Sequence, residues 1–134
     1  DRHAGGIASA AAAEYYGAQI LVPAFEDNTE NYTRFFLVRR TADAVTAPNA
    51  NKVSIAFSLE NRAGSLVAAL SELSALGTNL TKIESRPVHG RPWEYIFYVD
   101  CQLRTREEAE RALAVLAPHC AMVKSLGVYR EAGD

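Results

Sequence analysis

The sequence predicts an α+β fold, and two patterns in its second half carry this prediction. Apolar and polar residues alternate as in a half-buried strand, with the apolar positions at Val53, Ile55, Phe57 and Leu59. Leucines then recur at helical spacing over residues 66–76, and Gly77 follows as a glycine that ends a helix. We expect Asn61 to cap the start of that helix.

The remaining elements follow in a regular order. Residues 79–88 contain a second strand, and alternation over residues 93–101 indicates a third, with His89-Gly90 as the hairpin turn. Residues 105–108 (T-R-E-E) form a predicted capping box for a second helix. The inner stripe of that helix consists of Ala109, Ala112, Leu113 and Leu116, and residues 120–129 form the last strand. The order βαββαβ is that of the ferredoxin-like fold, an antiparallel sheet with two helices on one face, in which the third and fourth strands flank the first.

The first part of the chain has a different character. Residues 8–16 are nearly all helix formers, ended by Gly17, while residues 19–22 and 34–38 are predicted as short strands. One helix and two strands do not easily enclose a core, so we interpret this part as a fragment that packs on something else. Residues 41–50 are small, polar and aperiodic, as in a linker. The predicted organisation is therefore a fragment over residues 1–40, a linker over 41–50 and a domain over 51–134.

Composition and charge exclude several classes of function. Fourteen Lys and Arg against sixteen Asp and Glu give a net charge of −2, which argues against nucleic-acid binding and against a polybasic membrane surface. No apolar run approaches the ~20 residues that span a bilayer. The three histidines are isolated, so no metal site is expected. The predicted sheet separates Cys101 and Cys120 too widely for a disulfide, which indicates free thiols and a cytoplasmic location.

The turn at residues 60–65 (E-N-R-A-G-S) is the first candidate site. It lies between the first strand and its helix, where unpaired backbone N–H groups and the helix dipole favour an anion. Gly64 leaves room for a ligand carboxylate to approach. The alternative is that Gly64 only permits tight packing of the helix on the sheet, and spacing alone does not separate the two interpretations.

The second candidate is the polar strand at residues 79–87 (N-L-T-K-I-E-S-R-P). The alternation places Lys82, Glu84 and Arg86 on one face, and Pro87 marks a strand end or an edge. The three charged residues could form a solvated surface, which is the commoner case, or the polar wall of a pocket for an ammonium and a carboxylate.

The third candidate is residues 28–35 (N-T-E-N-Y-T-R-F), in which turn residues lead into a predicted strand. Arg34 can bind a carboxylate through two parallel hydrogen bonds, and Thr33 can hydrogen-bond to a leaving hydroxyl. Taken alone this signal is weak, because Thr and Arg at a strand start are common.

Three motifs in order give the chain a resemblance to the C-terminal part of prephenate dehydratase with its ACT regulatory domain. Residues 79–87 resemble the E-S-R-P motif with its usual leader, and residues 64–67 (G-S-L-V) resemble the G-A-L-V motif. Residues 33–35 resemble the catalytic T-R-F motif, and residues 93–100 are similar to the family's third strand. The positions that the resemblance implies for binding L-phenylalanine are Asn61, Ala63, Gly64, Ser65, Leu66, Val67, Asn79, Leu80, Thr81, Ile83, Glu84, Ser85 and Arg86.

The resemblance implies an enzyme that converts prephenate to phenylpyruvate without metal or organic cofactor. It implies catalytic positions at Thr33, Arg34 and Phe35, and inhibition by L-phenylalanine bound between ACT domains paired in a homodimer, with further pairing into tetramers left open. The family's catalytic domain is built mostly from sequence that would precede Asp1, so we expect the chain alone not to turn over prephenate. The alternatives are a stand-alone ACT module for amino-acid binding or dimerisation, and an enzyme assembled in trans.

Overall fold

The computed structural model describes residues 4–28, 33–45, 47–91 and 93–131. The chain divides into two compact units, Asp1–Val38 and Arg39–Asp134. In the described residues no helix has the length and apolar character needed to cross a membrane.

The first unit contains one helix, α1 (Ala10–Tyr16). The Ser9 hydroxyl accepts a hydrogen bond from the Ala12 N–H at 3.2 Å, and Gly17 ends the helix in the left-handed conformation at φ 62°. The predicted helix is thus confirmed, with Ser9 as its cap. The predicted strands at residues 19–22 and 34–38 are wrong, because neither segment forms a strand or joins the sheet in the described part of the chain.

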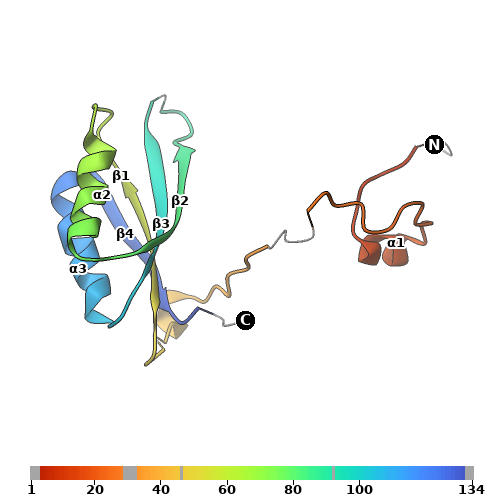
Figure 1. The fold of residues 1–134 in the computed structure, drawn as a ribbon, viewed down its shortest axis with the longest axis horizontal. Coiled ribbons are helices and arrows are strands. Elements are labelled where there is room, and N and C mark those ends of the chain that lie inside the picture. The colour runs from red at the N-terminus through yellow and green to blue at the C-terminus, as the bar shows by residue number, and fades with distance from the viewer. Residues whose placement is uncertain (1–3, 29–32, 46, 92, 132–134) are drawn as a thin grey trace. The chain divides into compact units, whose positions relative to one another are not determined.

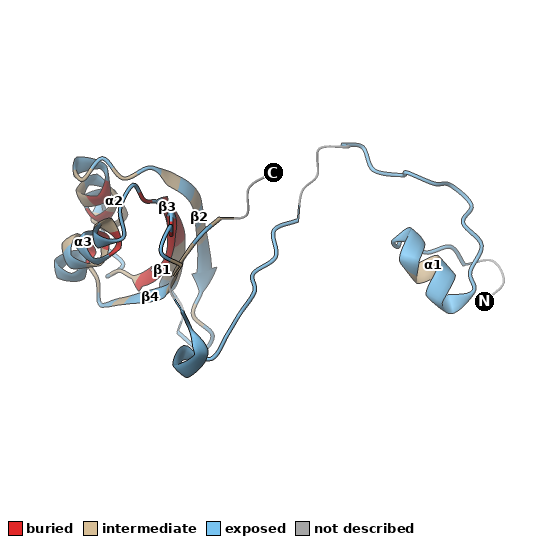
Figure 2. Cartoon of the chain, turned by 90° about the horizontal axis from the view of Figure 1, so that it is seen from below, coloured by how far each residue is buried: buried red, intermediate tan, exposed pale blue. Residues whose placement is uncertain are grey.

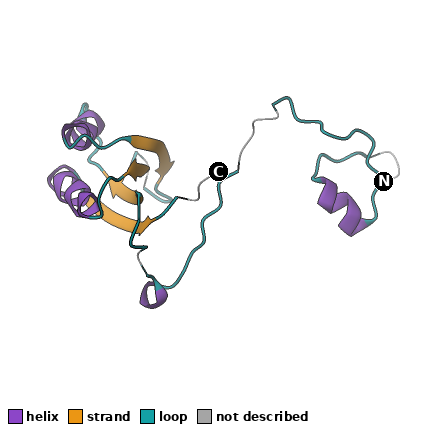
Figure 3. Ribbon diagram, turned by 60° about the horizontal axis from the view of Figure 1, so that its bottom comes forward, coloured by secondary structure: helices purple, strands orange, loops and turns teal. Residues whose placement is uncertain are grey.

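The second unit is a four-stranded antiparallel sheet with helices on one side. Its strands β1 (Lys52–Ser58), β2 (Leu80–Pro87), β3 (Tyr95–Gln102) and β4 (Met122–Tyr129) lie in the order β2-β3-β1-β4. The helices α2 (Ser65–Ala75) and α3 (Glu107–Leu116) cover one face together, as Figures 1 and 3 show. Short 3₁₀ turns, η1 (Thr41–Asp43) and η2 (Ala117–His119), lie in the linker and after α3. The predicted ferredoxin-like fold and the positions of its third and fourth strands are confirmed.

The core lies between the sheet and the two helices, where Figure 2 shows the buried residues. Phe57 of β1 stacks on Phe97 of β3 with ring centroids 5.5 Å apart. The alternating positions that the sequence predicted for β1 and the inner stripe predicted for α3 both face this core. Its buried members are Val53, Ile55, Phe57, Ala69, Leu73, Val99, Cys101, Leu103, Ala109, Ala112 and Leu116.

The strand β1 is buried on both faces, which corrects the prediction of a half-buried strand. Lys52, Ser54 and Ala56 are only 2%, 7% and 5% exposed, although they point away from the helices. A central strand is shielded by long side chains on its neighbours. The Ser54 hydroxyl donates to Asp100 Oδ1 at 2.5 Å and lies 2.8 Å from Tyr129 Oη, while Lys52 pairs with Glu131.

Both helices begin differently from the prediction. Asn61 is not the cap of α2, because the turn continues to Gly64, which takes the cap position at φ 83°. The capping box at residues 105–108 is also wrong, because the cap position of α3 is Arg106 and no side chain caps it. Glu108 instead accepts a hydrogen bond from the Arg104 N–H at 2.8 Å, one residue short of the predicted arrangement.

The strands and turns carry three further local features. The hairpin turn at His89-Gly90 is confirmed, with Gly90 at φ 76°, and Gly77 follows α2 at φ 70°. The pairing of β2 with β3 shifts register between Leu80 and Lys82, so Thr81 is an extra residue there. The pairing of β1 with β4 also shifts, beside Leu126. Both edges of the sheet, β2 and β4, lack a second neighbour in the described chain.

Both cysteines are free thiols, as predicted. Cys101 lies in the core, and its burial, with a smaller effect of the adjacent Asp100 carboxylate, raises the pKa of its thiol to about 11. Burial also raises the pKa of Cys120.

Candidate functional site

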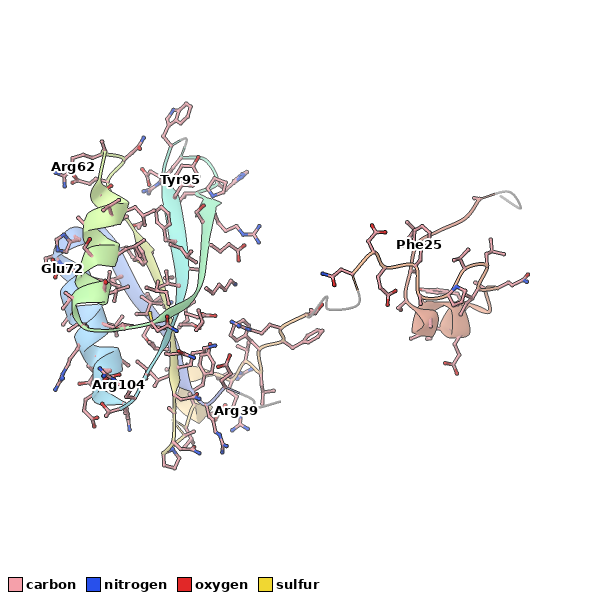
Figure 4. All side chains as sticks on the ribbon, in the orientation of Figure 1. Phe25, Arg39, Arg62, Glu72, Tyr95 and Arg104 are labelled. Carbon is pink, nitrogen blue, oxygen red and sulfur yellow. The ribbon has the colours of Figure 1, made fainter. Side chains whose placement is uncertain are left out.

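A hollow of about 200 Å³ lies where the loop after β1 meets the start of α2 and the start of β3. Figure 4 shows Arg62 and Tyr95, from two of these elements, at the same end of the domain. The hollow is lined by Leu59, Glu60, Asn61, Arg62, Gly64, Ser65, Leu66, Val67, Trp93, Tyr95 and Phe97.

The polar side of this hollow is the first turn of α2. The Ser65 hydroxyl donates to the carbonyl oxygens of Glu60 and Arg62 at 2.9 and 2.7 Å, which holds the turn closed. The Ser65 N–H donates to the Arg62 carbonyl oxygen at 3.2 Å, and no described side chain caps the N–H groups that follow it at the start of the helix. A Cβ added at Gly64 would meet nothing within 4 Å, so the glycine leaves the approach to these N–H groups open. This arrangement can receive a carboxylate.

The opposite side of the hollow is apolar and aromatic. Val67 and Trp93 are 68% and 75% exposed, and Tyr95 is 42% exposed, which is unusual for side chains of this size. Trp93 also has a positive φ of 73°, a strained conformation for a bulky residue. Strained backbone of this kind costs of order 1–3 kcal/mol and clusters at ligand sites. The hollow therefore combines an anion-accepting end with an apolar wall.

The predicted face of β2 forms an ion-pair network. Lys82 Nζ lies 3.1 Å from the Glu84 carboxylate, and Arg86 pairs with its other oxygen. The hydrogen bond from Lys82 and the charge of Arg86 hold the pKa of Glu84 below its usual range. Ile83 and Ser85 point to the other face, opposite Val99 and Phe97 of β3. The predicted alternation between two faces is therefore confirmed from Lys82 to Arg86, whereas Thr81 is the extra residue of the register shift and falls outside it.

The two candidate regions do not meet within one chain. Of the predicted residues, Asn61, Gly64, Ser65, Leu66 and Val67 line the hollow, whereas no residue of β2 does. Asn79 lies at the other end of the domain, in a polar hollow of about 300 Å³. In Figure 4, Arg104 marks this end of the domain and Arg62 marks the end with the Gly64 hollow. The second hollow is lined by Asn51, Gly77, Asn79, Gln102, Leu103, Arg104 and Glu108.

The predicted catalytic residues Thr33, Arg34 and Phe35 lie in an exposed segment of the first unit. Neither the Gly64 hollow nor the Asn79 hollow includes them. The turn residues before them, 29–32, lie outside the described residues.

Sequence reasoning missed the aromatic wall of the Gly64 hollow. Trp93, Tyr95 and Phe97 were assigned only to a strand, since alternation does not show which end of the sheet a strand start occupies. The predicted hairpin turn at His89-Gly90 was the signal that could have located these residues. It places the start of β3 at the same end of the sheet as the end of β1.

Comparisons with known proteins agree with this architecture. The family model described as ACT domain matches residues 53–117, and the model described as prephenate dehydratase matches residues 1–43. A bifunctional chorismate mutase/prephenate dehydratase of Aquifex aeolicus (strain VF5) is 38% identical over 133 residues, which cover 98% of this chain and 36% of the relative.

Two solved structures share the fold. The prephenate dehydratase of Arthrobacter aurescens in complex with L-Phe has a TM-score of 0.54 and 28% identity, over 73% of this chain and 30% of that one. A protein described as GqqA, a novel type of quorum quenching acylases, has a TM-score of 0.61 and 27% identity, over 70% of this chain and 49% of that one.

The sheet, its two helices and the hollow at Gly64 define the second unit as an ACT domain. In the order of its two matches, the chain corresponds to the C-terminal part of prephenate dehydratases. It spans between a third and a half of the length of the curated relatives that it matches.

Proposed function

We propose that the chain is the regulatory part of a prephenate dehydratase and that its ACT domain binds L-phenylalanine between two copies of the chain. The observation that carries the proposal is the hollow at Gly64, which offers helix N–H groups on one side and exposed aromatic residues on the other. An amino acid with a carboxylate and an apolar ring matches both sides. The Arthrobacter aurescens structure, described as a complex with L-Phe, supports this choice of ligand.

Pairing of two chains through β2 explains how both candidate regions serve one ligand. The free edge of β2 can pair antiparallel with the same edge of a second copy around a two-fold axis. Antiparallel pairing places the start of one β2 beside the end of the other. The partner's Asn79 then lies toward the Gly64 hollow, whereas within one chain Asn79 and Gly64 occupy opposite ends of the domain.

The ligand would be held by three kinds of contact. Its carboxylate would accept hydrogen bonds from the first turn of α2, near Gly64 and Ser65. Its ring would pack on Leu66, Val67 and Trp93, which are exposed in the single chain and would lose water on binding. Its ammonium would meet polar groups or carbonyl oxygens of the partner's second strand.

We assign the catalytic part of the function to the first unit. Thr33 would assist departure of the prephenate hydroxyl, Arg34 would hold a substrate carboxylate, and Phe35 completes the motif. These side chains are exposed and line neither of the two hollows of the ACT domain, so we expect no phenylpyruvate from this chain alone. Product formed on adding the remaining part of a family catalytic domain would show that the segment can work in trans.

The proposed boundaries are 1–40 for the catalytic fragment, 41–50 for the linker and 51–134 for the ACT domain. The division into two units after Val38 and the family matches at 1–43 and 53–117 support this organisation. Trypsin should therefore cleave first at Arg39 or Arg40, and a stable fragment beginning elsewhere would contradict the boundary. The two free thiols support a reducing compartment such as the cytoplasm.

Calorimetric titration of L-phenylalanine, with sedimentation in parallel, tests the regulatory function. We expect saturable binding by a dimer, and ligand at about 100 times its dissociation constant should stabilise the domain by roughly 2.7 kcal/mol. Gly64→Val and Glu84→Ala should weaken binding while the domain stays folded. Glu110→Ala, on the exposed side of α3, is the matched control. A folded dimer that binds no L-phenylalanine would favour a stand-alone dimerisation module.

A further inference from the structure

We infer that the C-terminal tail forms a clamp that ties the end of the linker to the Asn79 end of the ACT domain. The clamp consists of Asn51, Lys52 and Glu131. This inference rests on the proposed L-phenylalanine site, because its regulatory role requires a ligand near Asn79. The chain enters the sheet at Lys52 and leaves it at Tyr129, and these two residues are register partners in neighbouring strands.

The clamp is held by hydrogen bonds on both sides of Asn51. The Asn51 N–H donates to the Tyr129 carbonyl oxygen at 3.1 Å, and the Glu131 N–H donates to Asn51 Oδ1 at 2.7 Å. The carbonyl oxygen of Asn51 accepts a hydrogen bond from the Leu103 N–H at 2.7 Å. Asn51 therefore uses its backbone and its side chain to join the linker, the tail and the segment after β3.

The buried charge of Lys52 makes the clamp depend on the tail. The Lys52 side chain is 2% exposed, and its ammonium pairs with the Glu131 carboxylate, which is 39% exposed. A buried ammonium that loses its carboxylate is strongly unfavourable, because water cannot replace the lost partner. Displacement of the tail would therefore also displace the start of β1, where the linker ends.

A continuous chain of hydrogen bonds leads from the clamp to the proposed ligand residues. Leu103 follows Gln102, whose N–H donates to the Asn79 carbonyl oxygen at 2.9 Å. The Asn79 side-chain amide donates to Gln102 Oε1 at 2.7 Å. Asn51, Asn79 and Gln102 also line the same polar hollow. A ligand that fixes the start of β2 would thus order the linker junction as well, which gives the ACT domain a route to the first unit.

Hydrogen exchange of the peptide covering residues 47–54 tests the clamp, using the full chain with and without saturating L-phenylalanine. We expect the ligand to slow exchange in this peptide several-fold in the natural sequence. Glu131→Gln removes the charge at nearly constant shape. It should abolish this response, and by linkage it should change L-phenylalanine affinity by no more than the factor by which the ligand slows exchange in the natural sequence. Arg130→Gln alters an exposed neighbour in the same tail and should keep the response.

Lys52→Met is the second variant, because it removes the buried charge instead of leaving it unpaired. It should fold and also lack the response. A response that persists in Glu131→Gln and Lys52→Met would overturn the clamp. Ligand binding with no change at residues 47–54 in the natural sequence would overturn it while leaving the proposed function intact. Absence of L-phenylalanine binding would overturn both.

Discussion

Ser54, Asp100 and Tyr129 form a polar cluster on the face of the sheet that the helices do not cover. This cluster should make a measurable contribution to stability, and Ser54→Ala tests it. Ser54 is 7% exposed, and its hydroxyl donates to the buried Asp100 carboxylate at 2.5 Å. Because the Ser54 hydroxyl proton is donated to Asp100, the Tyr129 hydroxyl, whose oxygen lies 2.8 Å from Ser54 Oγ, is the donor in the second hydrogen bond. Alanine would remove both hydrogen bonds and take one donor from the buried Asp100 carboxylate.

The expected loss follows from the two bonds. A hydrogen bond to a charged group contributes about 1.5–3 kcal/mol, and a neutral one about 1 kcal/mol. Tyr129 is half-buried and can regain water, so we expect a loss of about 2–3 kcal/mol. Urea unfolding followed by circular dichroism measures it. All buried residues of the described chain lie at or after Ala50, so the transition reports the ACT domain.

The outcome is decided by the midpoint of unfolding. With a slope of about 1–1.5 kcal/mol/M, the Ser54→Ala midpoint should fall by roughly 1.3–3 M at an unchanged slope. Ser74→Ala on the exposed face of α2 is the control and should stay within about 0.5 kcal/mol of the natural sequence. If the two variants have equal midpoints, the cluster does not stabilise the fold and the reasoning is refuted.

Three further predictions concern the hollow, the core and the thiols. Gly64→Ala and Gly90→Ala place a Cβ at φ 83° and 76° in open space, so each should cost roughly 1–2 kcal/mol in thermal unfolding. Only Gly64→Ala should also weaken L-phenylalanine binding, and equal affinities in the two variants would argue against the hollow as the site. Leu73→Ala removes a fully buried side chain and should cost about 2–5 kcal/mol in urea unfolding; a loss below about 1 kcal/mol would mean that the core repacks. Cys101, with its thiol pKa raised to about 11, should resist alkylation at pH 8 in the folded chain, whereas the half-buried Cys120 should react first, as mass spectrometry would show.

The order of elements could be predicted from the sequence because each element of the ACT domain has a clear local pattern. The alternation at Val53, Ile55 and Phe57 marks a face packed on helices, and all three residues are buried there. The same alternation could not show that Lys52 and Ser54 are buried as well. Their burial depends on Glu131, Asp100 and Tyr129, which are distant in sequence and come together only in the sheet.

The starts of the helices and the strands expected in the first unit were predicted less well, for related reasons. Asn61 has the chemistry of a cap, but the positive φ of Gly64 allows the turn to run three residues further. Segments such as residues 34–38 have strand composition, yet strand formation depends on a partner that composition does not reveal. The candidate binding residues were predicted by motif, and their separation to opposite ends of one domain became visible only in the structure.

The irregular pairing of β4 has a consequence for assembly. Each ACT domain has two free sheet edges, and a molecule that could pair through both would grow into an open-ended ribbon. The register shift beside Leu126 interrupts the ladder of β4, and the outward Lys124 adds a charge to the same strand. β2 has a register shift too, at Thr81, but its pairing with β3 runs regularly from Lys82 to Pro87. In the proposed dimer this regular stretch would be the edge that pairs, and the interrupted β4 edge would then stop growth at two chains.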